Sequence, residues 1–321
     1  NDYKGKFMLV FVLNAGSSSL KYQLINAKTA ELKASGLVER IGIDGILKHE
    51  VGENKKLTFE LPIPTHKEAI ELVLRILTND ETKVIDSIKE IQAIGHRIVH
   101  GGEFFKESTI VTPDVIEKIE QLIPLAPLHN PANIMGIKIC QELMPKIPNV
   151  AVFDTAFHQT MPKENFLYAV PYADYTEHHL RKYGFHGTSH YYVSNEAVKI
   201  LNKKDSKIIV CHLGNGSSVC AVRDGKSIST SMGLTPLEGL IMGTRSGDID
   251  AGVIPYLMEK KGLTSNQILD YLNKKSGILG ISGISSDLRE VIKASKDGDM
   301  RSKITIEMLC NRIKKYLCSY A

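Results

Sequence analysis

A short polar turn near the start of the chain, residues 14–21, has the composition of a phosphate-binding loop. Strand-like runs at 7–13 and 22–25 flank it, so the turn is expected to join two strands. Glycine lets backbone amides approach an anion, three serine hydroxyls add donors, Lys21 adds positive charge and Asn14 adds a neutral oxygen. The G-x-x-x-x-G-K-[ST] pattern of the common NTPase loop does not occur in the sequence. We therefore expect a hairpin that holds phosphate without a strand-to-helix loop.

A second strand–turn–strand segment with the same chemistry occurs in the other half of the chain. Residues 207–211 and 219–222 are strand-like, and the intervening 212–218 contain two glycines and two serines. One such turn alone is most simply an ordinary hairpin. Two copies, one in each half, favour a duplicated domain whose two phosphate-binding hairpins face one nucleotide cleft.

Three polar residues stand where α/β proteins form their sites, namely Arg97, Asp154 and His186. Arg97 follows an apolar strand, and its alternative role is to pair with a core carboxylate. Asp154 follows the buried run 150–153 and could anchor Mg²⁺ through water or cap the next turn. His186 lies between two glycines before a helix, where an anion is favoured, although a single histidine is more often structural. We expect His190 on the helix surface or at a cap.

A glycine-dense region, residues 231–250, surrounds Arg245 with small residues. The guanidinium fork matches the oxygens of carboxylates and phosphoryl groups. Its alternative partner would be Asp248 or Asp250, but packing alone does not require so many glycines, so we expect a ligand contact. Residues 287–289 open a later helix, and in the simplest view they are solvated. Two arginines, one histidine, a carboxylate and two glycine–serine hairpins fit phosphoryl transfer, which needs positioning and charge neutralisation more than covalent chemistry.

The composition limits the class of protein. The 321 residues suffice for two domains, and 43% hydrophobic and 24% charged residues are typical of a soluble globular chain. The net charge of +4 is slight, and without a basic stripe the sequence gives no support to nucleic-acid binding. No apolar run approaches the length of a membrane span. The five cysteines lack C-x-x-C spacing, which favours free thiols in a reduced, cytoplasmic protein.

The order of the expected elements indicates an α/β protein with two related domains. Strands are expected within 7–60, at 91–102, where the strand runs into a glycine turn, and at 150–153, 207–211 and 219–222. Helices are expected at 65–77, 112–123, 131–143, 188–201, 249–261, 264–275, 285–296 and 301–321. The expected divisions are a first domain at 1–150, a connecting region at 151–205 and a second domain at 206–321.

Several segments, taken in order, resemble the acetate kinase family: 10–21, 96–102, 152–158, 183–190, 212–218 and 233–250. The resemblance runs from Met8 to Ala321. It implies the fold of the acetate and sugar kinase, Hsp70 and actin superfamily, which is two duplicated actin-like (ribonuclease H-like) domains with an interdomain nucleotide cleft. The implied reaction is ATP + acetate ⇌ ADP + acetyl phosphate, with Mg²⁺, or Mn²⁺ in its place, in a cytoplasmic homodimer.

The resemblance also implies roles for individual residues. Asn14 helps to bind Mg²⁺, and Arg97 holds the acetate carboxylate. The implied catalytic residues are Arg97, Asp154, His186 and Arg245. The implied apolar pocket for the acyl methyl group is Val99, Leu128, Phe185 and Pro236, with the acyl site drawing on the connecting region. The implied nucleotide-binding residues are Ser17, Ser19, Lys21, His212, Leu213, Gly214, Asn215, Gly216, Asp287, Leu288 and Arg289.

The sequence departs from the family in one respect. The family's Gly-x-Gly-Glu-Asn adenosine segment and a later glutamate of its Mg²⁺ site do not occur in the printed chain. The expectation is therefore that the second domain lacks its C-terminal part and has an incomplete adenine pocket. A polypeptide that truly ended at Ala321 would then expose an unpaired sheet edge, bind ATP poorly and be nearly inactive alone.

Three alternatives stay open from the sequence. A propionate kinase of the same family is the nearest, because one methylene is worth roughly 1–3 kcal/mol of discrimination and four pocket residues do not decide it. A noncatalytic actin-like nucleotide-binding protein is a second, although it would not need Arg97, Arg245 and an apolar pocket together. A bare ATPase is a third, if water reaches the γ-phosphate.

Overall fold

The computed structural model describes residues 8–52, 55–203 and 205–321. It divides into two compact units, a first unit at residues 1–156 and a second unit at 157–321. Phe7, where the first strand was expected to begin, lies outside the described residues. The finer division at 150 and 205 stays a prediction.

The first unit contains an eight-stranded sheet in the order β5-β4-β3-β2-β1-β6-β8-β7. Neighbouring strands are antiparallel except at the centre, where β1, β6 and β8 run parallel. The strands are β1 (Leu9–Ala15), β2 (Leu20–Asn26), β3 (Glu31–Glu39), β4 (Ile46–Val51), β5 (Lys55–Glu60), β6 (Ile91–Ile98), β7 (Thr109–Ile110) and β8 (Asn149–Phe153). The helices are α1 (His66–Thr78), α2 (Pro113–Gln121) and α3 (Asn130–Leu143), with short 3-10 turns at Ile88–Glu90, Ile123–Leu125 and Ala156–Thr160.

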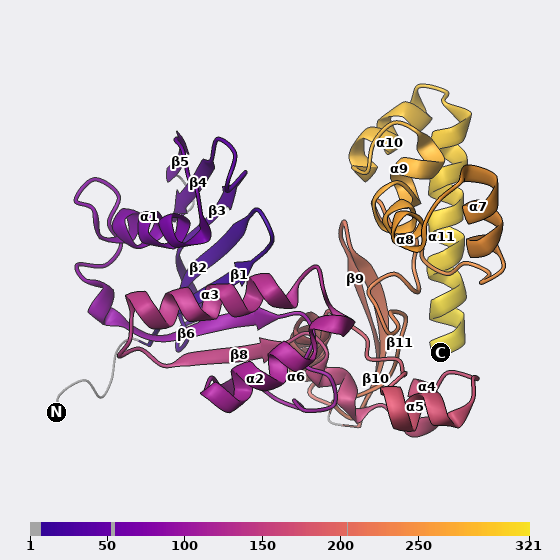
Figure 1. Ribbon diagram of the computed structural model, residues 1–321, viewed down its shortest axis with the longest axis horizontal. Helices are drawn as coiled ribbons and strands as arrows, with labels where there is room; N and C mark the ends of the chain where they lie inside the picture. Colours follow the sequence, from indigo (N-terminus) through magenta and orange to yellow (C-terminus); the bar gives the residue numbers. More distant parts are fainter. Residues whose placement is uncertain (1–7, 53–54, 204) are drawn as a thin grey trace. The chain divides into compact units, whose positions relative to one another are not determined.

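The hydrophobic core of this unit lies on one face of its sheet. Alternate residues of β1, namely Leu9, Phe11 and Leu13, are buried there, as the two-residue period of a strand requires. Ile70 of α1 and Cys140 of α3 belong to the same cluster, and Figure 1 shows both helices lying along the sheet. The helices therefore cover this face, and the polar side chains that end β1 and β6 project from the other.

The second unit begins with short helices and then combines a small sheet with a group of helices. Its sheet has the order β11-β10-β9 and is antiparallel throughout, and the long helix α11 contacts α9, α10 and β10 (Figure 1). The strands are β9 (Lys207–Leu213), β10 (Ser217–Arg223) and β11 (Lys226–Thr230). The helices are α4 (Lys163–Phe166), α5 (Tyr172–His178), α6 (Gly187–Leu201), α7 (Val253–Lys261), α8 (Ser265–Lys274), α9 (Gly277–Ser282), α10 (Leu288–Lys296) and α11 (Met300–Tyr320).

The structure confirms the α/β class and both predicted hairpins. β1 pairs with β2 around the first glycine–serine turn, with Asn14 opposite Lys21. β9 pairs with β10 around the second turn, with Leu213 opposite Ser217. Within the described part of the chain, no helix is both long and apolar enough to span a membrane.

Candidate functional site

Asn14 and Arg97 lie on neighbouring strands, on the same face and at the same end of the first unit's sheet. β1 and β6 are parallel with Leu13 opposite His96, and the two site residues each follow by one position. Leu13 and His96 are both buried on the face that carries the core, so their successors point to the opposite face. Asp154 directly follows β8, which is parallel to β6. Parallel strands thus bring three predicted site residues to one sheet edge.

Arg97 and Asp154 form a two-pronged ion pair at this edge. Arg97 Nε donates to Asp154 Oδ1 at 3.0 Å, and Arg97 Nη2 donates to Oδ2 at 2.6 Å. The carboxylate is almost fully buried, whereas 41% of the arginine side chain is exposed. The attraction of the Asp154 carboxylate raises the pKa of the Arg97 guanidinium. Arg97 thus does pair with a carboxylate, but its partner is itself a predicted site residue.

The first glycine–serine turn is tight and presents its side chains outward. Gly16 N–H donates to the Ser19 carbonyl at 2.8 Å, and a Cβ at Gly16 would lie 3.0 Å from Ser19 Oγ. Ser17 and Lys21 are exposed. A hollow of about 450 Å³ on this face of the sheet includes both Asn14 and Lys21 in its lining. The predicted phosphate cradle therefore has an accessible cation beside a close-packed turn.

Two buried asparagines, which the sequence did not single out, hold these segments in place. Asn133 Nδ2 donates to the Ala15 carbonyl at 2.9 Å, and Asn133 Oδ1 accepts from Val99 N–H at 3.1 Å. Asn130 makes the equivalent pair of bonds with the N–H and carbonyl of His100. Both lie in the first turn of α3, where a short amide can reach a neighbouring loop. Asn133 thereby links the end of β1 to Val99, two residues after Arg97.

The donors at this edge fit an Mg²⁺ ion that also binds substrate. Asn14 offers an amide oxygen, and Asp154 Oδ1, which accepts one bond from Arg97, keeps a second lone pair, whereas Oδ2 accepts from both Nε and Nη2. The described ranges contain no group of three or more His, Cys, Asp or Glu side chains that could hold a metal together. Mg²⁺ often takes one or two protein oxygens and completes its shell with water and phosphate oxygens. This donor set therefore suits an ion carried by a nucleotide.

In the second unit, the turn between β9 and β10 brings three predicted residues together. A Cβ at Gly216 would lie 3.4 Å from His186 Nε2 and 3.7 Å from Arg245 Nη1. The turn itself is closed by Gly214 N–H on the Gly216 carbonyl at 3.1 Å. A bare backbone thus faces an imidazole edge and a guanidinium.

Arg245 is positioned by the loop around it. Its Nη1 donates to the Pro236 carbonyl at 3.2 Å, and its carbonyl accepts from Met242 N–H at 3.1 Å. Gly277 packs directly against this turn in the left-handed region, with φ of 61°, and a Cβ there would collide with the Met242 carbonyl. Glycine is the residue that such backbone accommodates without strain.

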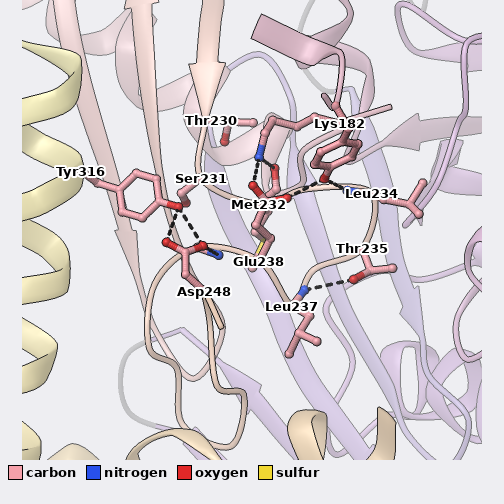
Figure 2. Close-up of polar contacts among 12 residues, drawn as sticks. Lys182, Thr230, Ser231, Met232, Leu234, Thr235, Leu237, Glu238, Asp248 and Tyr316 are labelled. Carbon is pink, nitrogen blue, oxygen red and sulfur yellow. Dashed lines mark hydrogen bonds and ion pairs between the residues drawn. The ribbon is translucent and has the colours of Figure 1, made fainter. Parts of the chain in front are cut away.

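The loop that carries Arg245 is anchored by two carboxylates (Figure 2). Asp248 accepts from Gly239 N–H at 2.8 Å and from the Tyr316 hydroxyl at 2.9 Å. Glu238 accepts from Lys182 and from the Tyr168 hydroxyl. Desolvation raises the pKa of both tyrosines, with a further rise from the neighbouring carboxylates. Asp248, considered above as an alternative partner of Arg245, is thus used to fix the loop to α11.

Four histidines, His158, His186, His190 and His212, lie close together near the turn between β9 and β10. The rings of His186 and His212 are stacked with their centroids 4.0 Å apart. His158 and His190 are both fully buried. The expectation that His190 serves the helix surface or a cap is wrong, because α6 turns this position inward, where its ring edge meets the other imidazoles. Desolvation lowers the pKa of His158 to about 4.

The remaining predicted residues differ in exposure. Val99 and Phe185 are buried in their respective units, Pro236 is partly buried and Leu128 is 62% exposed. Asp287 is the N-cap of α10, accepting from Arg289 N–H at 2.9 Å, and its carboxylate also pairs with the exposed Arg289 guanidinium. The acyl-pocket and nucleotide roles of these residues stay predictions.

Comparison with known proteins gives a consistent result. The model of the acetokinase family matches residues 9–321. The chain is 53% identical over 317 residues to a protein of Treponema denticola named acetate kinase, with 98% of this chain and 80% of that protein covered. Among solved structures, Porphyromonas gingivalis acetate kinase has a TM-score of 0.94 at 48% identity, covering 98% of this chain and 79% of that one. A propionate kinase of Francisella tularensis has a TM-score of 0.92 at 46% identity, with 98% and 80% covered.

Proposed function

Since the chain belongs to the acetokinase family, we propose that it catalyses the reversible transfer of the γ-phosphoryl group of ATP to acetate, giving acetyl phosphate and ADP. The observation that carries this proposal is the meeting of Gly216, His186 and Arg245 in the second unit. Backbone, imidazole and guanidinium donors placed together can stabilise the charge on several phosphoryl oxygens at once. A turn that served only to connect two strands would not need an imidazole and a guanidinium beside it.

Arg97 holds the acetate in this proposal. A guanidinium has five N–H donors, and Asp154 accepts from the Nε and Nη2 side of the fork. The donors that remain, on the outer edge, match the two oxygens of a second carboxylate. We assign the enclosure of the acyl methyl group to Val99, Leu128, Phe185 and Pro236.

The transfer itself needs no covalent enzyme intermediate. One acetate oxygen attacks the γ-phosphorus in line, and the bond from that phosphorus to the β–γ bridging oxygen breaks, so its electron pair leaves with ADP. The attacking carboxylate is already an anion, so the step requires no general base. Arg245 and His186 neutralise the phosphoryl group in transfer, and an arginine in such a role is worth about 10³–10⁵ in rate.

The metal and nucleotide contacts complete the proposal. Mg²⁺, held by Asn14 and, through water, by Asp154, would neutralise phosphate charge when bound. Ser17, Ser19 and Lys21 receive phosphate oxygens. The segments 212–216 and 287–289 contact the rest of the nucleotide. We further propose a cytoplasmic homodimer.

Formation of acetyl phosphate tests the function directly. The natural protein that carries this sequence should form hydroxamate from acetyl phosphate when it is given ATP, Mg²⁺, acetate and hydroxylamine. Release of phosphate without acetate-dependent hydroxamate would indicate a bare ATPase. ATP binding with neither product would indicate an actin-like binding protein.

The choice between acetate and propionate needs kcat/KM for each acid. We expect acetate to be the better substrate, because the chain is 53% identical to a protein named acetate kinase, and one methylene is worth roughly 1–3 kcal/mol of discrimination, which the assay resolves. A preference for propionate would assign the chain to the activity named for the Francisella tularensis structure.

A further inference from the structure

A single serine hydroxyl lies between two histidines of the second unit. Ser218 Oγ is 2.9 Å from His186 Nδ1 and 2.7 Å from His190 Nε2. Ser218 and His190 are fully buried, whereas His186 is only partly buried and its Nε2 edge faces the Gly216 turn. The three side chains thus form a short chain of hydrogen bonds that leads from the interior to the proposed phosphoryl site.

The direction of these hydrogen bonds is limited by the number of protons. A serine hydroxyl has one hydrogen to donate, and a neutral imidazole has one N–H and one acceptor nitrogen. If the hydroxyl donates to His186 Nδ1, it accepts from His190 Nε2–H. If it donates instead to His190, the proton of His190 sits on Nδ1, and His186 donates from Nδ1 to Ser218.

The surroundings of His190 decide between these two hydrogen-bond arrangements. Within the described part of the chain, His190 Nδ1 is buried and has no hydrogen-bond partner. A buried N–H without a partner costs about 1–3 kcal/mol, and such groups are rarer than unsatisfied acceptors. The proton of His190 is therefore better placed on Nε2, where Ser218 accepts it. Desolvation lowers the pKa of His190 to about 2, so its ring is neutral at physiological pH.

We propose that His190 is a positioning residue that acts through the Ser218 hydroxyl to hold His186 as the tautomer protonated on Nε2. Ser218 then donates to His186 Nδ1, and the His186 Nε2–H points toward the turn where Arg245 also lies. In that form the imidazole is a hydrogen-bond donor to a phosphoryl oxygen without carrying a full charge. Stacking on His212 fixes the plane of the ring. This inference rests on the proposed role of His186 in phosphoryl transfer.

The tautomer can be measured in the unmodified protein. Long-range ¹H–¹⁵N correlation spectra of the histidine side chains distinguish Nε2-protonated from Nδ1-protonated rings, and substitution of His186 by glutamine assigns its signals. We expect His186 and His190 both to be neutral and protonated on Nε2. A neutral His186 protonated on Nδ1 would overturn the proposal, even if the protein makes acetyl phosphate. Conversely, the expected tautomers in a protein without kinase activity would remove the proposed function and leave this geometry intact.

Variants test whether the chain of hydrogen bonds matters for turnover. Ser218→Ala should lower kcat about 10- to 100-fold, the cost of removing the outer hydrogen bond of a metal-ligating histidine, with KM for ATP and acetate little changed. His190→Phe should lower kcat similarly. His190→Gln should recover most of the loss, since its amide N–H can donate from near the position of Nε2. The spectra should show His186 shifting toward the Nδ1-protonated form in Ser218→Ala.

Ser194, which follows His190 by one turn of α6, provides a matched control for Ser218→Ala. Ser194 is also buried, but its hydroxyl donates to the Tyr191 carbonyl of its own helix. Ser194→Ala should therefore leave kcat and the His186 tautomer unchanged. Wild-type kcat in correctly folded Ser218→Ala, or no recovery in folded His190→Gln relative to His190→Phe, would contradict the proposal. If the His190 variants do not fold, Ser218→Ala and the wild-type spectra still decide the question.

Discussion

The two glycine–serine turns share a strand–turn–strand form but are supported in different ways. In the first unit, His66 Nε2 binds the Gly16 carbonyl and Asn133 Nδ2 binds the Ala15 carbonyl. These supports contact backbone, which leaves the side chains of the turn outward. In the second unit, side chains from distant segments, His186 and Arg245, approach a turn that offers them bare backbone. The first turn therefore carries its own functional groups, whereas the second is a surface against which others are placed.

The largest effect should come from removing one of the groups placed against the second turn. Arg245→Ala should lower kcat by about 10³–10⁵-fold, because charge on the phosphoryl group in transfer is then no longer neutralised. Binding of ADP, measured by calorimetry, should persist.

The control for this variant is Arg223→Ala, which removes an exposed arginine at the end of β10. Its turnover should equal that of the wild type. If Arg245→Ala turned over at a wild-type rate, Arg245 would have no part in the mechanism, and the contrast between the two turns would disappear.

Removal of a backbone support in the first unit should affect stability. Asn133→Ala leaves the Ala15 carbonyl and the Val99 N–H without their partner in a buried setting. We expect the free energy of unfolding, from urea titration, to fall by about 2–3 kcal/mol. Asn195→Ala, which removes an exposed bond within α6, should change it by less than about 0.5 kcal/mol. A fall no larger than in that control would show that Asn133 does not support the turn.

Lowering the pH should destabilise the surroundings of the second turn more than those of the first. Burial lowers the pKa of His158 to about 4 and of His190 to about 2, whereas an unfolded histidine titrates near pH 6.5. The unfolded chain thus binds more protons below pH 6.5, and stability falls as the pH falls from that value toward the folded pKa. Between pH 7 and 5 we expect a loss on the order of 1–2 kcal/mol per histidine.

Hydrogen exchange can locate this loss. The amides near Ser218 should become less protected relative to pH-matched intrinsic rates at pH 5. Those near Gly16 should change less, because one buried histidine of lowered pKa, His96 opposite Leu13, lies beside that turn, whereas His158 and His190 both lie near the second turn. Equal loss of amide protection near Gly16 and near Ser218 would contradict this expectation.

The smallest effect on stability should come from breaking the exposed ion pair between Arg289 and Asp287. The Arg289 side chain is 90% exposed and pairs with the N-cap Asp287, and exposed pairs contribute little to stability. Arg289→Ala should leave the melting temperature nearly unchanged but weaken ADP binding if the 287–289 segment contacts nucleotide. Unchanged ADP affinity would remove Arg289 from the predicted nucleotide site.

The sequence predicted what is encoded locally. Both hairpins follow from apolar runs around glycine–serine turns, and the strand-end positions of Arg97 and Asp154 follow from the runs before them. The identity of their mutual partner did not follow, because 57 residues separate the two.

The supporting residues were missed for the same physical reason. Asn133 binds a carbonyl 118 residues away, and an asparagine near a helix start has many simpler uses. A lone polar residue in a helix is normally solvated, which predicts an outward His190, whereas the serine that makes its burial tolerable lies on β10. Such contacts depend on tertiary packing, which a linear pattern does not contain.

If Arg97 holds the acetate, as proposed, its pairing with Asp154 bears on how quickly the acetate binds and dissociates. A guanidinium whose charge is already shared with one carboxylate attracts a second one less strongly than an isolated arginine would. Because the Arg97 side chain is also 41% exposed, water competes for its outer edge. A small monocarboxylate should therefore dwell only briefly there, which suits a catalyst that must release its organic product in either direction.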